Sequence, residues 1–219
     1  MNTSNDILHC FLEGKFERMS CPQCDNTFLT NVYHMKCFEA DQRLEVKCQT
    51  CKKQYQTDLQ SEAWQEYVLL EKYALGLEYF NDAIRQHQLT HVPFIKRIGI
   101  LDECDQTLAP DVVQLFSHEE PDYRLIYIME RLEHLDEADA QFFTDYVYGM
   151  DWKDEATRRQ IIQWIAERYG QPLAEDVRKL CRYFRKHEEF LAWDLHGDNL
   201  MRRKSDGVIV VMDPYALKV

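Results

Sequence analysis

Three side chains near the end of the sequence carry oxygen atoms in an order that suits phosphoryl transfer. Asp194 and Asn199 lie five positions apart, and Asp213 directly follows the apolar run 208–212. Transfer from a nucleotide needs one carboxylate that orients the attacking hydroxyl and accepts its proton, and two oxygen ligands for the divalent ions that neutralise the phosphates. Asp194 would supply the first, and Asn199 and Asp213 the second. Because residues 208–212 predict a buried strand, Asp213 would be fixed on a rigid support.

These residues resemble the catalytic motifs of the protein-kinase-like superfamily. The segment 193–199, WDLHGDN, is similar to the loop HRDxxxxN of protein kinases and, more closely, to HGDLHxxN of aminoglycoside phosphotransferases. Asp213 matches the metal-binding Asp of the DFG motif. The resemblance implies that Asp194 is the catalytic Asp, that Asn199 and Asp213 hold Mg²⁺, and that ATP is the phosphoryl donor. It also implies a two-lobe α+β fold whose C-terminal lobe is mainly helical.

The sequence departs from protein kinases on both sides of these residues. Ala-Trp replaces the His-Arg pair before Asp194, and Pro-Tyr replaces Phe-Gly after Asp213. We therefore expect no receiver for a phosphorylated activation loop. Because six residues follow Asp213, the resemblance is to the minimal kinases of bacteriophages and secreted bacterial effectors, which lack an activation segment. It covers residues 94–219, and we expect the acceptor, a protein hydroxyl, to be selected by another surface or by a partner protein.

Four of the eight cysteines are arranged as two CxxC pairs. Each pair makes a tight turn that presents two thiolates, so two pairs complete the tetrahedral shell of a zinc ion. The predicted ligands are Cys21, Cys24, Cys48 and Cys51. Short β-favouring runs between the pairs are typical of the hairpins of a zinc ribbon. His34 and Cys37 are further candidates as substitute ligands, and a redox-active CxxC pair is the alternative interpretation.

The residues that would hold the nucleotide's phosphates are harder to find. Kinases use a Lys on the third strand of the small lobe, paired with a Glu from the following helix, beneath a Gly-rich loop. Lys47 ends a strand-like run, and Glu66, or else Glu62, would be its partner on a long helix that we expect over residues 58–86. No glycine cluster precedes Lys47, so the backbone of residues 25–30 would have to cover the phosphates. A surface lysine beside a zinc knuckle is the open alternative.

The elements that position these residues follow from the hydrophobic pattern. Residues 94–101 and 124–129 predict two strands. The second resembles the strand and hinge that contact adenine in kinases, which implies that Glu130 and Leu132 bind the nucleotide. Helices are expected over the ranges 136–148, 155–169 and 173–189, the last two being separated by Gly170-Gln171-Pro172.

These elements predict three parts along the chain. Residues 1–57 would form a zinc-ribbon-like β segment, and residues 58–132 the long helix and strands of the small lobe up to the hinge. Residues 133–219 would form the helical lobe with the catalytic loop. On the helix expected over 173–189, several Lys and Arg residues form a basic face, which is either a solvated surface or a site for a phosphate or a partner.

Composition limits the partners. The chain has 219 residues, 45% of them hydrophobic, and a formal net charge of −12, so it can build a core but lacks the basic face that nucleic acids and anionic membranes require. No stretch has the length of a membrane span, and the N-terminus has no secretion signal. We therefore expect a cytoplasmic protein that binds a nucleotide and a protein, and neither nucleic acid nor membrane.

The favoured hypothesis is an ATP-dependent phosphotransferase with a structural zinc site. One alternative is a pseudokinase or zinc-ribbon module that only binds other proteins, which the missing glycine cluster favours. A second is a small-molecule kinase, because the catalytic loop resembles antibiotic kinases as much as protein kinases. A third interpretation is that Asp194 and Asp198 are ordinary turn residues and that Asp213 merely ends a strand.

Overall fold

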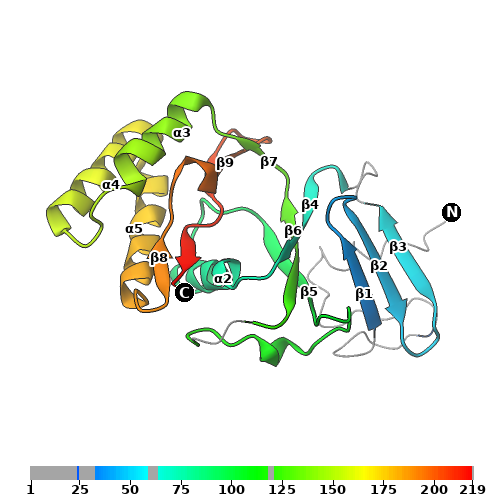
Figure 1. The fold of residues 1–219 in the computed structure, drawn as a ribbon. Coiled ribbons are helices and arrows are strands. Elements are labelled where there is room, and N and C mark those ends of the chain that lie inside the picture. The colour runs from blue at the N-terminus through cyan, green and yellow to red at the C-terminus, as the bar shows by residue number, and fades with distance from the viewer. Residues whose placement is uncertain (1–23, 25–32, 59–63, 118–120, 219) are drawn as a thin grey trace. The chain divides into compact units, whose positions relative to one another are not determined.

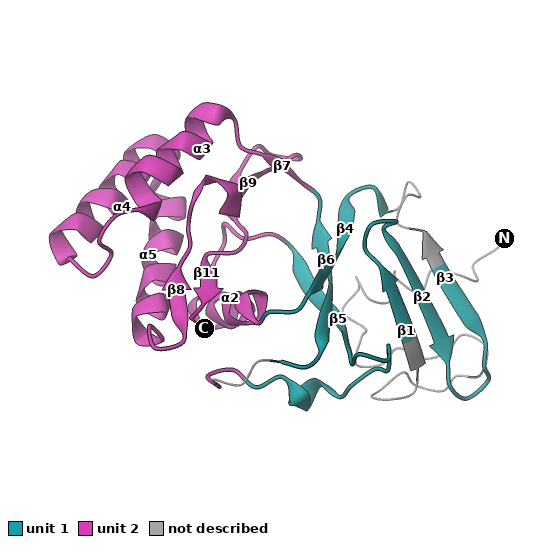
Figure 2. Cartoon of the chain, in the orientation of Figure 1, with its two compact units in different colours: residues 1–74, 94–114, 120–131 teal, residues 75–93, 115–119, 132–219 magenta. Residues whose placement is uncertain are grey.

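The computed structural model describes residues 24, 33–58, 64–117 and 121–218, with the side chains of 33, 34, 57 and 58 left aside. The chain divides into two compact units (Figure 2). Unit 1 comprises residues 1–74, 94–114 and 120–131, and unit 2 comprises residues 75–93, 115–119 and 132–219. Both helices and small sheets are present, so the fold class is α+β as predicted.

Unit 1 contains two antiparallel three-stranded sheets (Figure 1). The first has the order β1-β2-β3, formed by β1 (Tyr33–Phe38), β2 (Arg43–Cys48) and β3 (Gln54–Asp58). The second has the order β4-β6-β5, formed by β4 (Tyr67–Lys72), β5 (Ile95–Leu101) and β6 (Arg124–Glu130). A short 3-10 helix, Pro110–Val112, lies between β5 and β6 in the sequence.

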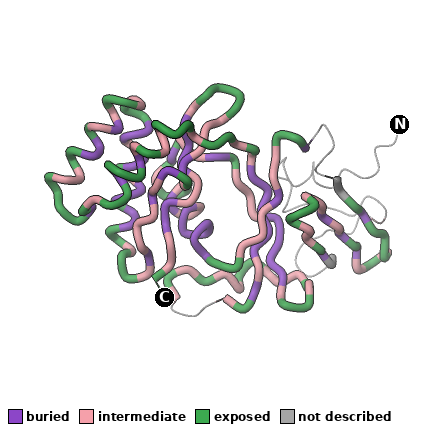
Figure 3. The backbone as a smooth tube through the Cα atoms, turned by 45° about the horizontal axis from the view of Figure 1, so that its top comes forward, coloured by how far each residue is buried: buried purple, intermediate pink, exposed green. Residues whose placement is uncertain are grey.

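One hydrophobic core joins the two sheets of unit 1. Five consecutive residues of the central strand β6 are buried (Figure 3), as expected for a strand covered on both faces. Met35 of β1 is also fully buried and belongs to the same core cluster. A Cβ atom on Gly99 of β5 would lie 2.7 Å from Met35 Sδ, so a larger residue at position 99 would displace the end of the Met35 side chain.

The prediction of one long helix over residues 58–86 is wrong. Residues 67–72 form strand β4, and the helix α2 spans only Gly76–His87. The apolar run at the start of β4 suits either a strand or a buried helix, so periodicity alone does not distinguish them. Antiparallel pairing with β6 over the whole length of β4 selects the strand. The strands expected over 94–101 and 124–129 are confirmed as β5 and β6.

The remaining helices belong to unit 2 and confirm the predictions, with ends shifted by a few residues. They are α3 (Glu137–Phe143), which continues as a π-helix over Thr144–Tyr148, α4 (Glu155–Tyr169) and α5 (Gln171–Lys186). Asp136 and Asp154 cap α3 and α4 by accepting backbone N–H bonds. Gly170, with φ of 98°, and Pro172 at the start of α5 separate α4 from α5.

Short strands complete unit 2. They are β7 (Leu132–His134), β8 (Leu191–Trp193), β9 (Leu200–Arg203), β10 (Ile209–Val211) and β11 (Tyr215–Leu217). They form a three-stranded sheet, β10-β9-β7, and a two-stranded sheet, β11-β8. The 3-10 turn Gly197–Asn199 connects β8 to β9. Among the described residues, no helix combines the length and apolar character that crossing a membrane requires.

A buried carboxylate ties the loop after α2 to α5 within unit 2. Asp176 is 2% exposed, and its Oδ2 accepts bonds from Thr90 N at 2.7 Å, Thr90 Oγ1 at 2.9 Å and His91 N at 2.7 Å. Burial raises the pKa of Asp176, but these hydrogen bonds to the charged form outweigh burial and lower it below its ordinary value. The ionised side chain therefore stabilises the fold.

Candidate functional site

The loop between β8 and β9 brings Asp194 and Asn199 into direct contact. Nδ2 of Asn199 donates to the backbone carbonyl of Asp194 at 2.6 Å and lies 3.2 Å from its Oδ2. The loop wraps back on itself because Asn199 N donates to the carbonyl of His196, and His196 N to that of Asp194, each at 3.0 Å. The acid and the amide predicted from their spacing therefore face the same side of one loop.

Asp213 is fixed beside this loop by hydrogen bonds from the residues on either side of it. The N–H of Met212 donates to the carbonyl of Asn199, and the N–H of Asp194 donates to the carbonyl of Pro214, both at 2.9 Å. Strand β11 pairs with β8, and β10 pairs with β9, so Asp213 lies in the connection between two strands that flank the loop. All three predicted residues thus lie in connections between short, paired strands of unit 2.

His196 is part of the same loop. Its Nε2 lies 3.1 Å from Nδ2 of Asn199 and 3.8 Å from Oδ1 of Asp194, and its Nδ1 accepts a bond from the N–H of Asp198 at 3.2 Å. The ring of Tyr148 packs edge-on against the imidazole. The side chains of Asp194 and His196 are 30% and 28% exposed, so the loop is braced on one side and open to solvent on the other.

Two glycines allow helices to approach the site closely. A Cβ atom on Gly197 would lie 2.4 Å from the carbonyl oxygen of Ala140 in α3, and Gly197 N donates to Thr144 Oγ1. A Cβ atom on Gly76, the first residue of α2, would lie 3.3 Å from Oδ1 of Asp213. The start of α2 therefore adjoins Asp213, a neighbour that the sequence analysis missed because it placed residue 76 inside a longer helix.

A second candidate site lies in unit 1, where three thiols come together. The Sγ atoms of Cys24, Cys48 and Cys51 all lie within 4.8 Å of one another, and those of Cys24 and Cys48 are 3.8 Å apart. Tetrahedral zinc with bonds of about 2.3 Å would place its sulfur ligands roughly 3.8 Å apart. The turn after β2 sets this geometry, since Lys52 N donates to the carbonyl of Cys48. The cluster can hold a metal ion.

The other predicted ligands contribute less. Cys21 and the side chain of His34 lie outside what the structure describes. Cys37 is described, and burial followed by the negative charge of Glu71 raises the pKa of its thiol to about 12. A thiol held protonated in this way is a poor metal ligand, and Cys37 is not among the three clustered cysteines.

Lys47 was expected to pair with Glu66 because Glu66 would lie on a long helix. That prediction of a helix at Glu66 is wrong. Lys47 lies in β2 with an exposed side chain, and Glu66 lies in a turn before β4, where its carbonyl accepts the N–H of Arg131 at 2.6 Å. No helix carries Glu66, because pairing with β6 makes the following residues a strand. Glu62 and residues 25–30, which we expected near the phosphates, fall outside the described residues.

A different lysine has the strand-to-helix order that we sought. Lys72 is the last residue of β4, and α2 begins four residues later with the buried Glu78 in its first turn. Lys72 was not predicted, because residues 58–86 were expected to form one helix. The signal was the run Tyr67–Lys72, in which Tyr, Val and Leu precede a lysine.

The two hinge candidates flank the passage of the chain from unit 1 to unit 2. Glu130 ends β6, and its N–H donates to the carbonyl of Phe94 at 2.9 Å. Leu132 begins β7, which pairs with β9 of unit 2. Unit 1 ends at Arg131, so the predicted hinge coincides with a unit boundary.

Comparison with known proteins supplies no relative. Neither the models of known protein families nor the curated proteins include a match to this chain. The residues of the two candidate sites therefore carry the functional information.

Proposed function

We propose that the chain is an ATP-dependent phosphotransferase that acts on a protein hydroxyl. The observation that carries this proposal is the contact of Asn199 with Asp194, together with the backbone hydrogen bonds that fix Asp213 beside them. Turn preference alone explains an Asp at either position, but gives no reason for Asn199 to contact Asp194 while the backbone on both sides of Asp213 bonds to the same loop. The minimal kinase-like two-lobe fold is part of the same proposal.

The chemistry of the side chains assigns the roles. Asp194, half-exposed, would orient the acceptor hydroxyl and take its proton. Nδ2 of Asn199 donates to Asp194, so Oδ1 is the atom of this side chain that would serve as a hard oxygen ligand for a cation. Asp213 would supply the second ligand. Mg²⁺ held by Asn199 and Asp213 would neutralise the charge on the phosphates of ATP.

Lys72 replaces Lys47 as the proposed phosphate-binding lysine. It ends a strand that is hydrogen-bonded to the central strand β6 and precedes a helix, which is the order that the kinase resemblance requires. The backbone at Glu130 and Leu132 remains the proposed contact for the adenine ring.

We also assign zinc to the cluster of Cys24, Cys48 and Cys51, with Cys21 as the fourth ligand. Three sulfur donors at this spacing suit zinc, a borderline-soft ion that favours tetrahedral thiolate sites. Cys48 is buried in the core of unit 1, and Cys24 and Cys51 pack against that core. Zinc would therefore act on folding rather than on phosphoryl transfer.

A binding protein without catalysis is the second candidate. It is favoured by the absence of any glycine between Gly14 and Gly76 in the sequence, since kinases cover the phosphates with a Gly-rich loop. Binding of Mg²⁺ and ATP distinguishes the two functions.

Calorimetric titration with ATP and Mg²⁺ tests the proposal. We expect magnesium-dependent binding that Asp213→Ala reduces by at least roughly tenfold, because the variant loses an ionic ligand of the cation. Lys72→Ala should weaken binding, and Lys47→Ala is its matched control and should not. With an acceptor protein, Asp194→Ala should retain binding and abolish transfer. No binding at millimolar ATP, or equal binding by wild type and Asp213→Ala, would overturn the phosphotransferase proposal.

A further inference from the structure

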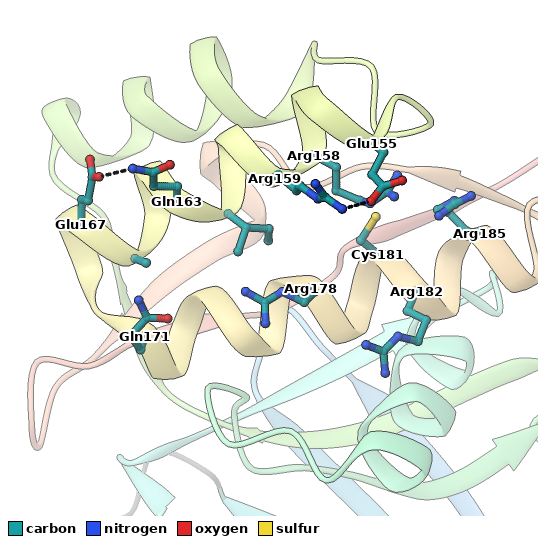
Figure 4. Close-up of a pocket in the computed structure, with 12 residues that line it drawn as sticks. Glu155, Arg158, Arg159, Gln163, Glu167, Gln171, Arg178, Cys181, Arg182 and Arg185 are labelled. Atoms are coloured by element: carbon teal, nitrogen blue, oxygen red, sulfur yellow. Dashed lines mark hydrogen bonds and ion pairs between the residues drawn. The ribbon is translucent and has the colours of Figure 1, made fainter.

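A groove of about 690 Å³ runs between α4 and α5 in unit 2 (Figure 4). The two helices are antiparallel neighbours joined at Gly170. The floor of the groove is apolar and consists of Ile162, Ala166 and Cys181. Polar and charged side chains from both helices form its sides. None of these residues belongs to the candidate catalytic loop.

The groove is basic in a protein whose net charge is −12. It is lined by two glutamates and by five arginines, namely Arg158, Arg159, Arg178, Arg182 and Arg185. The charge is uneven along its length. Arg158, Arg159 and Arg185 lie at one end, whereas Gln163, Glu167 and Gln171 lie at the other (Figure 4).

Internal ion pairs account for only part of this charge. Arg159 is paired with Glu155, and Arg178 with Glu175. Arg158 donates to the backbone carbonyls of Trp152 and Lys153, at 3.0 and 3.3 Å, and its charge helps to lower the pKa of the exposed Asp154. Arg182 and Arg185 are exposed, and in the described part of the chain neither forms an ion pair.

The buried thiol of Cys181 lies at the basic end of the groove. Burial raises the pKa of Cys181 to about 11, and the positive charges of Arg158 and Arg185 oppose that rise. Both guanidinium groups are thus close enough to act on the floor of the groove. A ligand there would meet an apolar surface below and positive charge on both sides.

The spacing of the arginines selects an elongated ligand. The pair of Arg178 with Glu175 is exposed and therefore weak, so Arg178 can still attract a ligand. Arg178 and Arg185 are seven positions apart on α5, which is about 10 Å along the helix axis. One phosphate group is much smaller than this distance, whereas an extended peptide advances about 10 Å in three residues. Guanidinium groups bind carboxylates through two parallel hydrogen bonds. We propose that the α4–α5 groove binds an acidic segment of a partner protein.

This binding function goes beyond phosphoryl transfer and does not depend on it. The groove and the Asp194 loop share no residue, so a catalytically inactive protein should bind the same segment. Acidic side chains would contact Arg182, Arg185 and Arg158, and the stems of those side chains would cover the apolar floor.

The test is fluorescence anisotropy with the full chain and a fluorescein-labelled decaglutamate peptide. We expect binding that weakens as salt is raised. Arg182→Glu/Arg185→Glu should raise the dissociation constant at least roughly tenfold, because attraction becomes repulsion at the basic end. The control, Lys186→Glu/Lys204→Glu, makes the same change in net charge at exposed lysines outside the groove and should raise it about threefold or less. Thermal melting checks that both variants fold.

Three results would overturn the proposal. The first is no binding of decaglutamate by the wild type at millimolar peptide in low salt. The second is equal weakening by the two double variants, which would indicate general electrostatic attraction. The third is displacement of the peptide by inorganic phosphate at a concentration that supplies the same total negative charge as the peptide. That result would indicate a compact anion site instead of a peptide site.

Discussion

At the scale of single residues, a candidate site residue could be predicted when its position depends on residues close to it in the sequence. Asp194 and Asn199 were recognisable because their contact depends on one short loop, and Asp213 because it follows a strand. Lys72 was not recognisable, since its position depends on pairing between β4 and β6, which are more than fifty residues apart in the sequence. A site residue was therefore found where its neighbours in sequence are also its neighbours in space.

Asp176 gives a prediction at this scale. Because its pKa is lowered in the folded state, its contribution to the free energy of unfolding is complete above the ordinary carboxyl value of 3.8 and is lost as the pH falls through the lower folded value. Asp176→Asn should destabilise the protein at pH 7 by about 1–3 kcal/mol, since the neutral amide cannot accept all three bonds as well. It should also flatten the acid limb of the stability curve.

Urea denaturation from pH 7 to pH 3 measures both effects. Asp41→Asn, at an exposed turn of unit 1, is the control and should leave the curve unchanged. A variant of Asp176 with the wild-type dependence on pH would contradict this assignment.

At the scale of elements, periodicity predicted the helices of unit 2 and failed at β4. Helices α3, α4 and α5 have local start and stop signals, including Asp136, Asp154 and Gly170, which residues close in sequence supply. The run at the start of β4 is apolar without a distinguishing period, so tertiary pairing decided its structure. The same ambiguity displaced the beginning of α2 and concealed its approach to Asp213.

The packing of α3 on the loop of residues 194–199 leads to a second prediction. Gly197→Ala would place a methyl group within 2.4 Å of the carbonyl oxygen of Ala140, so the loop or the helix must move. We expect a loss of about 1–3 kcal/mol in the free energy of unfolding and a loss of magnesium-dependent ATP binding, because Asn199 moves with the loop.

Gly149→Ala is the matched control, since a Cβ atom at Gly149 meets nothing within 4 Å. It should be neutral or slightly stabilising. Chemical denaturation and calorimetry of the two variants test the prediction, and equal behaviour of both would show that the contact with α3 is unimportant.

At the scale of the whole molecule, the metal cluster should govern the folding of unit 1. Cys48→Ser/Cys51→Ser should remove the bound zinc and lower the melting temperature, because structural zinc sites supply folding free energy directly. A chelator should act on the wild type in the same way. Cys104→Ser, at an exposed cysteine outside the cluster, is the control. Unchanged metal content and melting in the double variant would refute the zinc assignment.

The α+β class was predictable from sequence, but the division into units was not. The chain enters unit 2 at residue 75, returns to unit 1 at residue 94, belongs to unit 2 again over residues 115–119 and passes finally into it at residue 132. Hydrophobic patterns assign types to elements but do not state which elements share a core. We expected three consecutive parts along the chain. That division did not predict that α2 belongs to the same unit as the loop of residues 194–199.

This interleaving has a consequence for inheritance and engineering. A gene fragment that encodes residues 132–219 would lack α2, whose first residue adjoins Asp213, and a fragment ending at residue 131 would carry α2 without the strands that it packs on. Recombination at the hinge would therefore separate parts of one core. Each unit can change by substitution, but neither can be exchanged as a cassette.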